Sequence, residues 1–324
     1  MANSQRSKKT SHQLVFGPVP SRRLGRSLGV NHIPHKVCSY SCSYCQIGKA
    51  IEIQIQRQPF FSTEFIILQI KKRLNKLLAQ EYPNYITFVP DGEPTLDINL
   101  GLLIKKIKQF GFPVAIITNG SLLHFNSVKD DLMGADYISI KIDSVNPTVW
   151  RQINRPHKGL NLEQILRSIM EFSKDYTGTL VTETMLIKGK NDNVSAFLQL
   201  ADFIKDINPQ KAYIAIPTRP PAFSNTFPAD EQSVTQAYNA FSRIGLSAEL
   251  LIGYEGNAFT STGSFREDLL SITSVHPLRA GAVNELMTRS DGSAEMLKML
   301  ICKKLIKQIS YNGEEYYVRR FTGV

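Results

Sequence analysis

The chain has 324 residues, of which 42% are hydrophobic and 20% charged, and its formal net charge is +10. This composition predicts a globular protein with one large domain and room for a small second one. No apolar run approaches the roughly 20 residues that a membrane-spanning helix needs, and residues 1–11 do not resemble a secretory signal. We therefore expect no membrane association and a cytoplasmic location.

The positive charge is concentrated near the amino terminus. Residues 1–12 are polar and are predicted to form a disordered basic segment. Up to Gln58, the only acidic residue is Glu52, against nine basic ones: Arg6, Lys8, Lys9, Arg22, Arg23, Arg26, Lys36, Lys49 and Arg57. Such a region can attract nucleic acid or another polyanion, although a solvated basic arm accounts for it equally well.

Over residues 13–255, short β-branched or aromatic runs alternate with longer segments of helical periodicity. This alternation is typical of βαβ units in a parallel sheet. Strands are predicted at Ser27–Asn31, Tyr85–Val89, Val114–Thr118, Tyr137–Ile142, Leu180–Ile187 and Lys211–Ile216. Helices are predicted at Glu64–Ala79, Leu100–Gln109, Ser121–Met133, Leu162–Phe172, Val194–Ile207 and Asp230–Ile244.

Nearly all of the unusual residues in this segment follow the last apolar residue of a predicted strand. In order of the strands they are the cysteines, Asp91–Pro94, Asn119 and Gly120, Asp143, Lys188–Asn191, and Thr218–Pro221. Because ligands bind at the carboxyl edge of a parallel α/β sheet, these loops are expected to line one site.

The pattern weakens after the barrel segment, and residues 256–273 are predicted to be a linker. A second unit over 274–324 follows, with helices at His276–Thr288 and Ser293–Leu305 and a hairpin of Lys307–Tyr311 and Glu314–Arg320. Asn312 and Gly313 suit the type I′ turn of such a hairpin. These elements predict a small winged-helix-like domain, although a third helix is not visible in the sequence.

The segment CSYSCSYC places three cysteines, Cys38, Cys42 and Cys45, within one short loop. Three clustered thiols in a reducing compartment are typical of metal ligands. Three thiolates on a [4Fe-4S] cluster leave one iron open for a further ligand. A zinc site completed by His32 or His35 is the alternative, but zinc requires four ligands and a second ligand pair is missing at the usual spacing.

The cysteine spacing, with Tyr44 before the last cysteine, resembles the signature of the radical S-adenosylmethionine (SAM) superfamily. The resemblance implies a partial (β/α)6 TIM-like barrel whose cluster binds SAM and cleaves it reductively to a 5′-deoxyadenosyl radical. It also implies an electron donor such as flavodoxin or ferredoxin. Gly92, Glu93 and Pro94 match the superfamily's second motif, with Asp91 where a glycine is usual.

The same resemblance implies roles for other strand-end residues. Glu93 holds the amino group of SAM, and a helix N-cap is the alternative role for this carboxylate. The other implied contacts of SAM are its carboxylate or ribose with Thr118 and Asn119, its ribose hydroxyls with Asp143, and its adenine with Ile187 and Gly189. Core packing or turn formation accounts equally well for these last positions.

Four longer stretches, GPVPSRRLGRSLGVN, INRPHKGL, ETMLIKGKND and PTRPP, resemble a radical SAM subgroup related to the wyosine tRNA base-forming Fe-S oxidoreductases. The cationic residues in them are expected to ring the barrel mouth and bind substrate: Arg22, Arg23, Arg26, Arg155, His157 and Arg219. Bonds from the arginines to loop carbonyls are the alternative. The tRNA-modifying relatives carry a second cluster, whereas this chain has only Cys302 left, which we expect to be a buried hydrophobe.

These observations favour an enzyme that modifies an RNA base, with the carboxyl-terminal unit helping to bind the RNA. Two alternatives stay open. The first is radical modification of a protein or small metabolite, and the second is a cluster-containing regulator whose winged helix binds DNA. The SAM motif around Glu93 favours catalysis over sensing.

Overall fold

The computed structural model describes residues 14–253 and 261–320, so the predicted disordered segment 1–12 and part of the predicted linker lie outside the described residues. Its main feature is an eight-stranded sheet in the order β1-β2-β5-β6-β7-β8-β9-β10. β1 is antiparallel to β2, and the other neighbours are parallel. The strands are β1 Val15–Ser21, β2 Gly25–Val30, β5 Tyr85–Phe88, β6 Val114–Thr118, β7 Tyr137–Lys141, β8 Thr179–Met185, β9 Lys211–Ala215 and β10 Ala248–Leu251.

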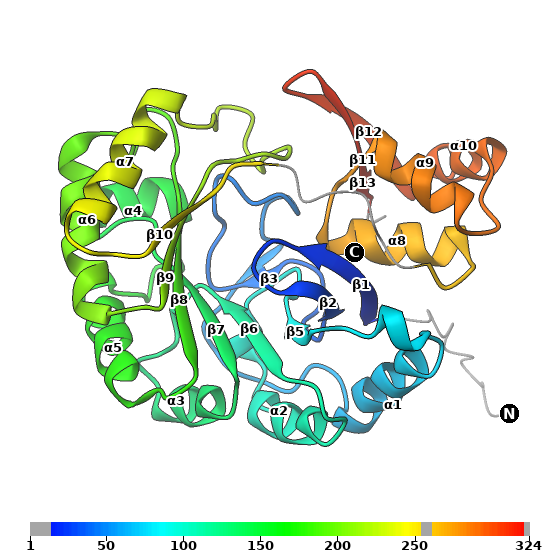
Figure 1. The fold of residues 1–324 in the computed structure, drawn as a ribbon, viewed down its shortest axis with the longest axis horizontal. Coiled ribbons are helices and arrows are strands. Elements are labelled where there is room, and N and C mark those ends of the chain that lie inside the picture. The colour runs from blue at the N-terminus through cyan, green and yellow to red at the C-terminus, as the bar shows by residue number, and fades with distance from the viewer. Residues whose placement is uncertain (1–13, 254–260, 321–324) are drawn as a thin grey trace, which may run out of the picture.

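Helices cover the outer face of this curved sheet (Figure 1). They are α1 Thr63–Leu74, α2 Leu100–Lys108, α3 Asn126–Met133, α4 Pro147–Asn154, α5 Leu162–Asp175, α6 Val194–Ile207 and α7 Glu231–Arg243. Each amphipathic helix turns its apolar side to the sheet, and in α5 the buried residues Leu162, Ile165, Ile169 and Phe172 follow helical spacing. Asn161 caps that helix by accepting a hydrogen bond from the Gln164 amide.

The predicted partial barrel is confirmed, and the six predicted strands form its centre. The sequence missed β1 and β10, which add one strand at each edge of the sheet, and it missed α4. The strand predicted to extend to Ile187 ends at Met185, which leaves the next residues in the loop at the carboxyl edge. The barrel is therefore wider than predicted, but its carboxyl edge lies where the sequence placed it.

The carboxyl-terminal unit has three helices and a three-stranded antiparallel sheet of order β11-β13-β12. Its elements are α8 Phe265–Val275, β11 Leu278–Arg279, α9 Ala280–Thr288, α10 Ala294–Cys302, β12 Ile306–Tyr311 and β13 Glu314–Arg319. The predicted linker is wrong from residue 265 on, because α8 contributes Phe265, Leu269 and Ile272 to the core of this unit. α8 is the third helix that the sequence did not show.

This unit packs beside β1, on the right in Figure 1. Val19 of β1 contacts its apolar core, and the side chains of Arg73 and Asp268 approach to 3.9 Å. The hydroxyls of Tyr311 and Tyr316 donate hydrogen bonds to the carbonyls of Pro217 and Thr218, in the loop after β9. The hairpin is thereby attached to a loop at the carboxyl edge of the barrel.

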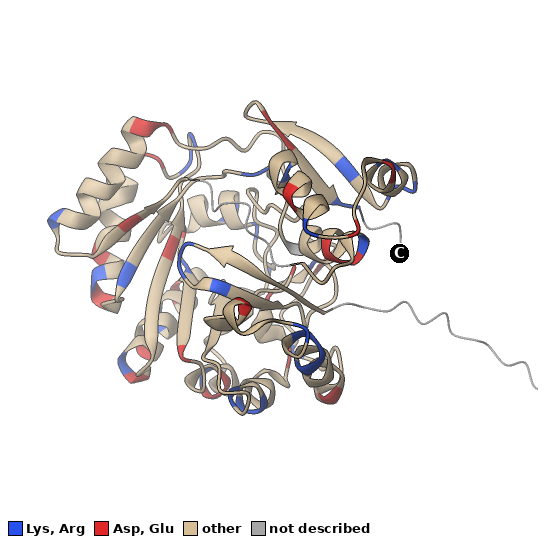
Figure 2. Cartoon of the chain, turned by 45° about the vertical axis from the view of Figure 1, so that its right-hand side comes forward, with Lys and Arg blue, Asp and Glu red and all other residues tan. Residues whose placement is uncertain are grey.

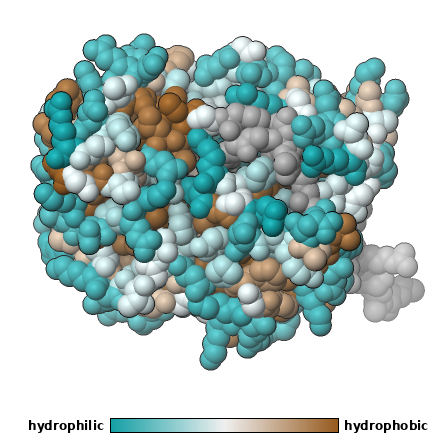
Figure 3. Space-filling model, viewed as in Figure 1, coloured by the Kyte–Doolittle hydropathy of each residue, from teal (hydrophilic) through white to brown (hydrophobic). Residues whose placement is uncertain are grey.

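Acidic and basic residues alternate over the outer helices and the carboxyl-terminal unit (Figure 2). The face seen in Figure 3 is mostly hydrophilic, with small hydrophobic patches. No helix among the described residues is both long and apolar enough to cross a membrane.

Candidate functional site

The three clustered cysteines lie on a loop that other segments hold at the carboxyl edge of the barrel. The loop begins at β3 (Val37–Cys38), which pairs with β4 (Glu52–Ile53). The amides of Ser41 and Ser43 donate to the carbonyls of Asn154 and Ile153 at the end of α4, at 3.1 and 2.7 Å. Backbone hydrogen bonds to β4 and to the end of α4 thus hold the loop in place.

Each cysteine sulfur in the loop lies near at least one side-chain N–H donor. Lys36 Nζ lies 3.1 Å from the Cys45 sulfur, Asn154 Nδ2 lies 3.5 Å from that of Cys42, and Asn119 Nδ2 lies 3.9 Å from that of Cys38. Hydrogen bonds to ligand sulfurs are a principal means by which a protein tunes an iron–sulfur cluster. The donor set therefore fits three thiolates bound to a cluster.

Burial raises the pKa of the Cys42 thiol to about 12 and raises that of Cys38 as well. Buried thiolates need nearby positive charge, which bound iron supplies. The structure disfavours the zinc alternative, because His32 is buried against Pro94 and His35 Nδ1 lies 2.5 Å from Asp91 Oδ2.

Gly92 is required by the close approach of β3. A Cβ atom at Gly92 would lie 1.9 Å from the Val37 carbonyl oxygen, and the Glu93 amide donates to this same oxygen at 3.2 Å. Asp91, where the family usually has glycine, pairs with His35 and accepts the Lys36 amide on its carbonyl. This departure from the motif therefore anchors the segment that precedes the cysteines.

Glu93 is 2% exposed, and both of its carboxylate oxygens accept hydrogen bonds. One oxygen accepts from Thr95 and from the Thr118 hydroxyl at 2.5 Å, and the other accepts from the Asn119 amide at 2.9 Å. Burial raises the Glu93 pKa although these bonds oppose the shift. Glu93 caps a short 3-10 helix that starts at Pro94, as the alternative reading proposed, and it also lies close to Cys38.

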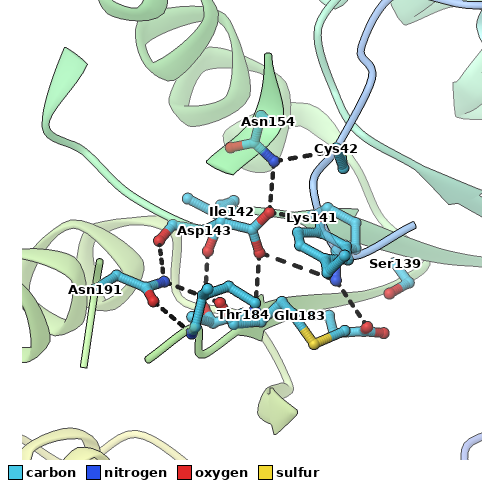
Figure 4. A network of polar contacts seen from close by, with 12 residues as sticks. Cys42, Ser139, Lys141, Ile142, Asp143, Asn154, Glu183, Thr184 and Asn191 are labelled. Atoms are coloured by element: carbon cyan, nitrogen blue, oxygen red, sulfur yellow. Dashed lines mark hydrogen bonds and ion pairs between the residues drawn. The ribbon is translucent and has the colours of Figure 1, made fainter. Parts of the chain in front are cut away.

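Asp143 joins the cysteine loop to β7 and β8 (Figure 4). One of its oxygens accepts from the Tyr44 hydroxyl at 2.5 Å and from Asn154 at 2.6 Å, and the other accepts from the Met185 amide at 2.8 Å. Asn191 donates to the Asp143 carbonyl at 2.8 Å. Since Asn154 also reaches the Cys42 sulfur, Asp143 orients a donor to that cysteine.

A buried charge cluster that the sequence did not predict lies inside the barrel below Asp143. Lys141 lies 2.9 Å from one oxygen of Glu183 and 4.9 Å from the centre of the Tyr44 ring, and Arg23 pairs with the other oxygen of Glu183. Burial would raise the Glu183 pKa, but Arg23 and Lys141 lower it to about 2. Lys141 could have been found from its spacing, because it is the last residue of β7 and comes two residues before Asp143, and side chains two residues apart in an extended chain point to the same side.

The structure places Ile187 and Gly189 in the turn after β8. Ile187 is buried, and its amide donates to Asn191. Gly189 is exposed, has a positive φ of 70° and donates its amide to Asp192. These contacts are the turn chemistry that the sequence analysis kept as an alternative.

The six cationic residues do not form one ring at the barrel mouth. Arg26 bonds the Tyr82 carbonyl, close to where β5 begins, and Arg22 bonds the Leu251 carbonyl across the open side of the barrel. Arg23 reaches Glu183 in the barrel interior. For Arg22 and Arg26, bonding to backbone carbonyls, the alternative interpretation, describes the observed contacts.

The other three cationic residues lie near the cysteine loop. Arg155 follows α4, and the His157 amide donates to the Ser39 carbonyl at 2.9 Å. Arg219 donates to Gln46, just after Cys45, and to His276 at the end of α8. Arg219 thus links the cysteine loop to the carboxyl-terminal unit.

Cys302 is exposed at the end of α10, so the prediction that it is buried is wrong. The apolar stretch around it places Leu297 and Leu300 in the core and leaves Cys302 on the outer side of the helix.

Comparison with known proteins identifies the family of this chain. The model of the radical SAM superfamily matches residues 32–204. A UPF0026 protein of Methanocaldococcus jannaschii is 41% identical over 308 residues, 94% of this chain and 96% of its own length. An S-adenosylmethionine-dependent nucleotide dehydratase of Flammeovirga pacifica is 26% identical over 56% of this chain and 60% of its own length.

The fold matches that of a solved radical SAM structure. A radical SAM methyltransferase from Sphaerobacter thermophilus superposes with a TM-score of 0.55 at 13% identity, over 70% of this chain and 66% of its own. TYW1 with a bound lysine–pyruvate adduct gives a TM-score of 0.45 at 14% identity, over 92% of this chain and 82% of its own.

The barrel and its cysteine loop define a radical SAM enzyme. The chain belongs to the radical SAM superfamily and, within it, to the UPF0026 family. Membership implies a [4Fe-4S] cluster and SAM as cofactors.

Proposed function

We propose that this enzyme holds its [4Fe-4S] cluster on Cys38, Cys42 and Cys45, cleaves SAM reductively, and modifies a base in RNA. The observation that carries the first part is the cysteine loop, in which each of the three sulfurs has its own N–H donor. When bound, the cluster supplies the electron that breaks the sulfonium bond of SAM. The residues around it bind and orient SAM.

The proposed SAM contacts are the strand-end residues around this loop. Glu93 is already held by Thr118 and Asn119, so it can receive the amino group of SAM without reorganisation. The complete proposed set is Tyr44, Gly92, Glu93, Pro94, Thr118, Asn119, Asp143, Ile187 and Gly189. Lys141 and Glu183 line the barrel interior next to Asp143 and extend this polar surface.

For the substrate, we propose that the carboxyl-terminal unit is a winged-helix module that binds RNA. Its element order and the hairpin of β12 and β13 support this assignment. Its basic residues include Lys298, Lys303, Lys304, Lys307 and Arg320, all of them exposed, and such residues can contact phosphates. The attachment of Tyr311 and Tyr316 to the loop after β9 would hold bound RNA beside the barrel.

The direct test is nucleoside analysis of tRNA from cells with and without this protein. We expect one modified nucleoside to be missing without the protein, and purified, anaerobically reconstituted enzyme with SAM and dithionite to restore it. Unchanged nucleosides in both experiments would contradict the RNA assignment.

A free nucleotide is the second candidate substrate, because the Flammeovirga relative is named as a nucleotide dehydratase. In that case SAM cleavage should accelerate with a mononucleotide and not with tRNA. Measuring the rate of 5′-deoxyadenosine formation with each compound separates the two candidates.

A further inference from the structure

The outer side of the cysteine loop is flanked by two segments with an excess of positive charge. Residues 46–60 contain β4, which pairs with β3, and residues 153–159 bond the loop through the Ser41 and Ser43 amides. The two segments also meet each other, since a Cβ at Gly159 would lie 3.2 Å from the Ile55 side chain. They therefore form one continuous surface around the loop.

Two cations of this surface share one aromatic ring. Lys49 Nζ lies 4.5 Å from the centre of the Phe223 ring, and the Arg155 guanidinium lies 4.4 Å from it. The Phe223 amide donates to the Ser43 carbonyl at 3.1 Å, between Cys42 and Cys45 in the chain. The ring thus holds both positive charges directly over the loop that carries the cysteines.

Lys49, Arg155 and the nearby Lys158 are exposed, and none of them forms an ion pair with a carboxylate of the described residues. Glu52 is the single acidic residue in segments 46–60 and 150–160 of the sequence. Elsewhere on the surface, lysines such as Lys129 and Lys211 pair with glutamates. The charges beside the cysteine loop are left available for a partner.

The same surface contains exposed aliphatic side chains. Ile51, which directly precedes β4, is 67% exposed, and Ile53 in β4 is 40% exposed. Ile53 is the direct strand partner of Cys38. An apolar pair within a cationic rim is the usual composition of a small protein contact site.

We infer that this surface, defined by Lys49, Ile51, Ile53, Arg155 and Lys158, docks a small acidic one-electron carrier protein. The inference rests on the proposed cluster, since reductive cleavage of SAM needs one electron for each turnover. The carrier loses that electron and the cluster gains it. A partner seated on Ile53 and Phe223 is separated from the cysteine ligands only by the loop and its neighbouring strand.

Charge complementarity selects an acidic protein, and the isoleucines favour a protein over a nucleic acid, because phosphate contacts gain nothing from exposed aliphatic groups. Electron-transfer contacts are small, and the charges around them chiefly control the association rate. Lys49, Arg155 and Lys158 supply such charges on this surface.

The test uses reconstituted enzyme and an oxidised flavodoxin as the probe, titrated by calorimetry at two salt concentrations. Lys49→Glu with Lys158→Glu is compared with Lys72→Glu with Lys105→Glu, which makes the same charge change at exposed positions on α1 and α2. We expect the first pair to weaken binding by about tenfold or more and to flatten its salt dependence, and the second to leave it within about twofold. Ile51→Ser, which alters no charge, should weaken binding by a few-fold.

Stopped-flow reduction by flavodoxin hydroquinone should slow in the Lys49 and Lys158 variant, whereas dithionite-driven SAM cleavage should be unchanged. Absence of SAM cleavage in the wild-type enzyme with dithionite would contradict the proposed function, while the calorimetric titration would still report on docking. Wild-type affinity for flavodoxin in both the double variant and Ile51→Ser would overturn the inference. Loss of tRNA binding together with unchanged flavodoxin binding would also overturn it and assign the surface to RNA.

Discussion

On the inner side of the cysteine loop, Glu93 and Asp143 are buried and both oxygens of each carboxylate accept hydrogen bonds. On its outer side, Lys49 and Lys158 are exposed and have no carboxylate partner among the described residues. A preorganised cofactor site requires fixed polar groups, because reorganisation during the reaction is costly. A surface for a transient partner requires accessible charge. The loop therefore separates a rigid side, which we propose binds SAM, from a side whose charges are accessible to other molecules.

The largest effect should come from removing a cysteine of the loop. Serine at Cys38, Cys42 or Cys45 replaces a soft thiolate, so each variant should lose the brown colour and SAM cleavage after reconstitution. Iron and sulfide analysis should give about four of each per wild-type chain. Cys302→Ser, at an exposed position far along the chain, is the control and should keep both properties. Cluster loss in that control alone would show that the ligands are misassigned.

Gly92→Ala should have the next largest effect. Its Cβ would overlap the Val37 carbonyl oxygen, so β3 and the adjoining Cys38 would have to move. Overpacking of this kind costs about 1–3 kcal/mol and sometimes more, and we expect a lower denaturation midpoint together with reduced iron content. Gly253→Ala is the matched control, because its Cβ would meet only the end of Arg22 at 4.0 Å. Equal stability and iron content in the two variants would refute the packing argument.

Glu93→Gln should weaken SAM binding and leave the cluster in place. Glutamine keeps the shape of the side chain but removes a charge-assisted bond worth roughly 1.5–3 kcal/mol, which is about ten- to hundredfold in the dissociation constant. Equilibrium binding of SAM to the reconstituted protein measures this change. Glu52→Gln at an exposed position should bind SAM normally. An unchanged dissociation constant in the Glu93 variant would remove this residue from the SAM site.

The smallest effect concerns the reduction potential. Lys36 is 4% exposed and donates to the Cys45 sulfur, so it stabilises the more negative, reduced cluster. Lys36→Met should lower the midpoint potential by several tens of millivolts, given that about 59 mV corresponds to 1.4 kcal/mol for one electron. A redox titration followed by electron paramagnetic resonance gives this value. Lys158→Met, on the outer side, should leave the potential unchanged, and equal shifts in both variants would contradict the distinction between the two sides.

The residues that lie on the inner side of the cysteine loop could be predicted from the sequence, because the spacing of the cysteines and of the predicted strands determines where these residues lie. Cysteines three or four residues apart must share one loop, and the residues after parallel strands must meet at one edge. The sequence predicted the positions of Asn119 and Asp143 in this way. In the structure Asn119 bonds Ser39, next to Cys38, and Asp143 bonds Tyr44, next to Cys45. Lys36 and Asn154 were missed, since their roles depend on side-chain direction and on α4, a short helix with few apolar residues.

The errors have physical causes of the same kind. The sequence predicts a linker where α8 lies because the segment is rich in serine and threonine. In the structure Ser271, Thr273 and Ser274 bond carbonyls of their own helix and leave its apolar residues to pack. The sequence predicts the arginines near β1 at the barrel mouth, because it does not show that the turn between β1 and β2 directs Arg23 into the barrel. In both cases the structure depends on tertiary contacts, which the sequence alone does not show.

The central claim is that the cysteine loop holds a cluster that cleaves SAM. The most direct measurement is the formation of 5′-deoxyadenosine by reconstituted wild-type protein and by its Cys42→Ser variant, each given SAM and dithionite without substrate. The account predicts slow release by the wild type and none by the variant. Equal amounts from the two proteins, or none from a wild-type protein that contains its full complement of iron, would contradict it.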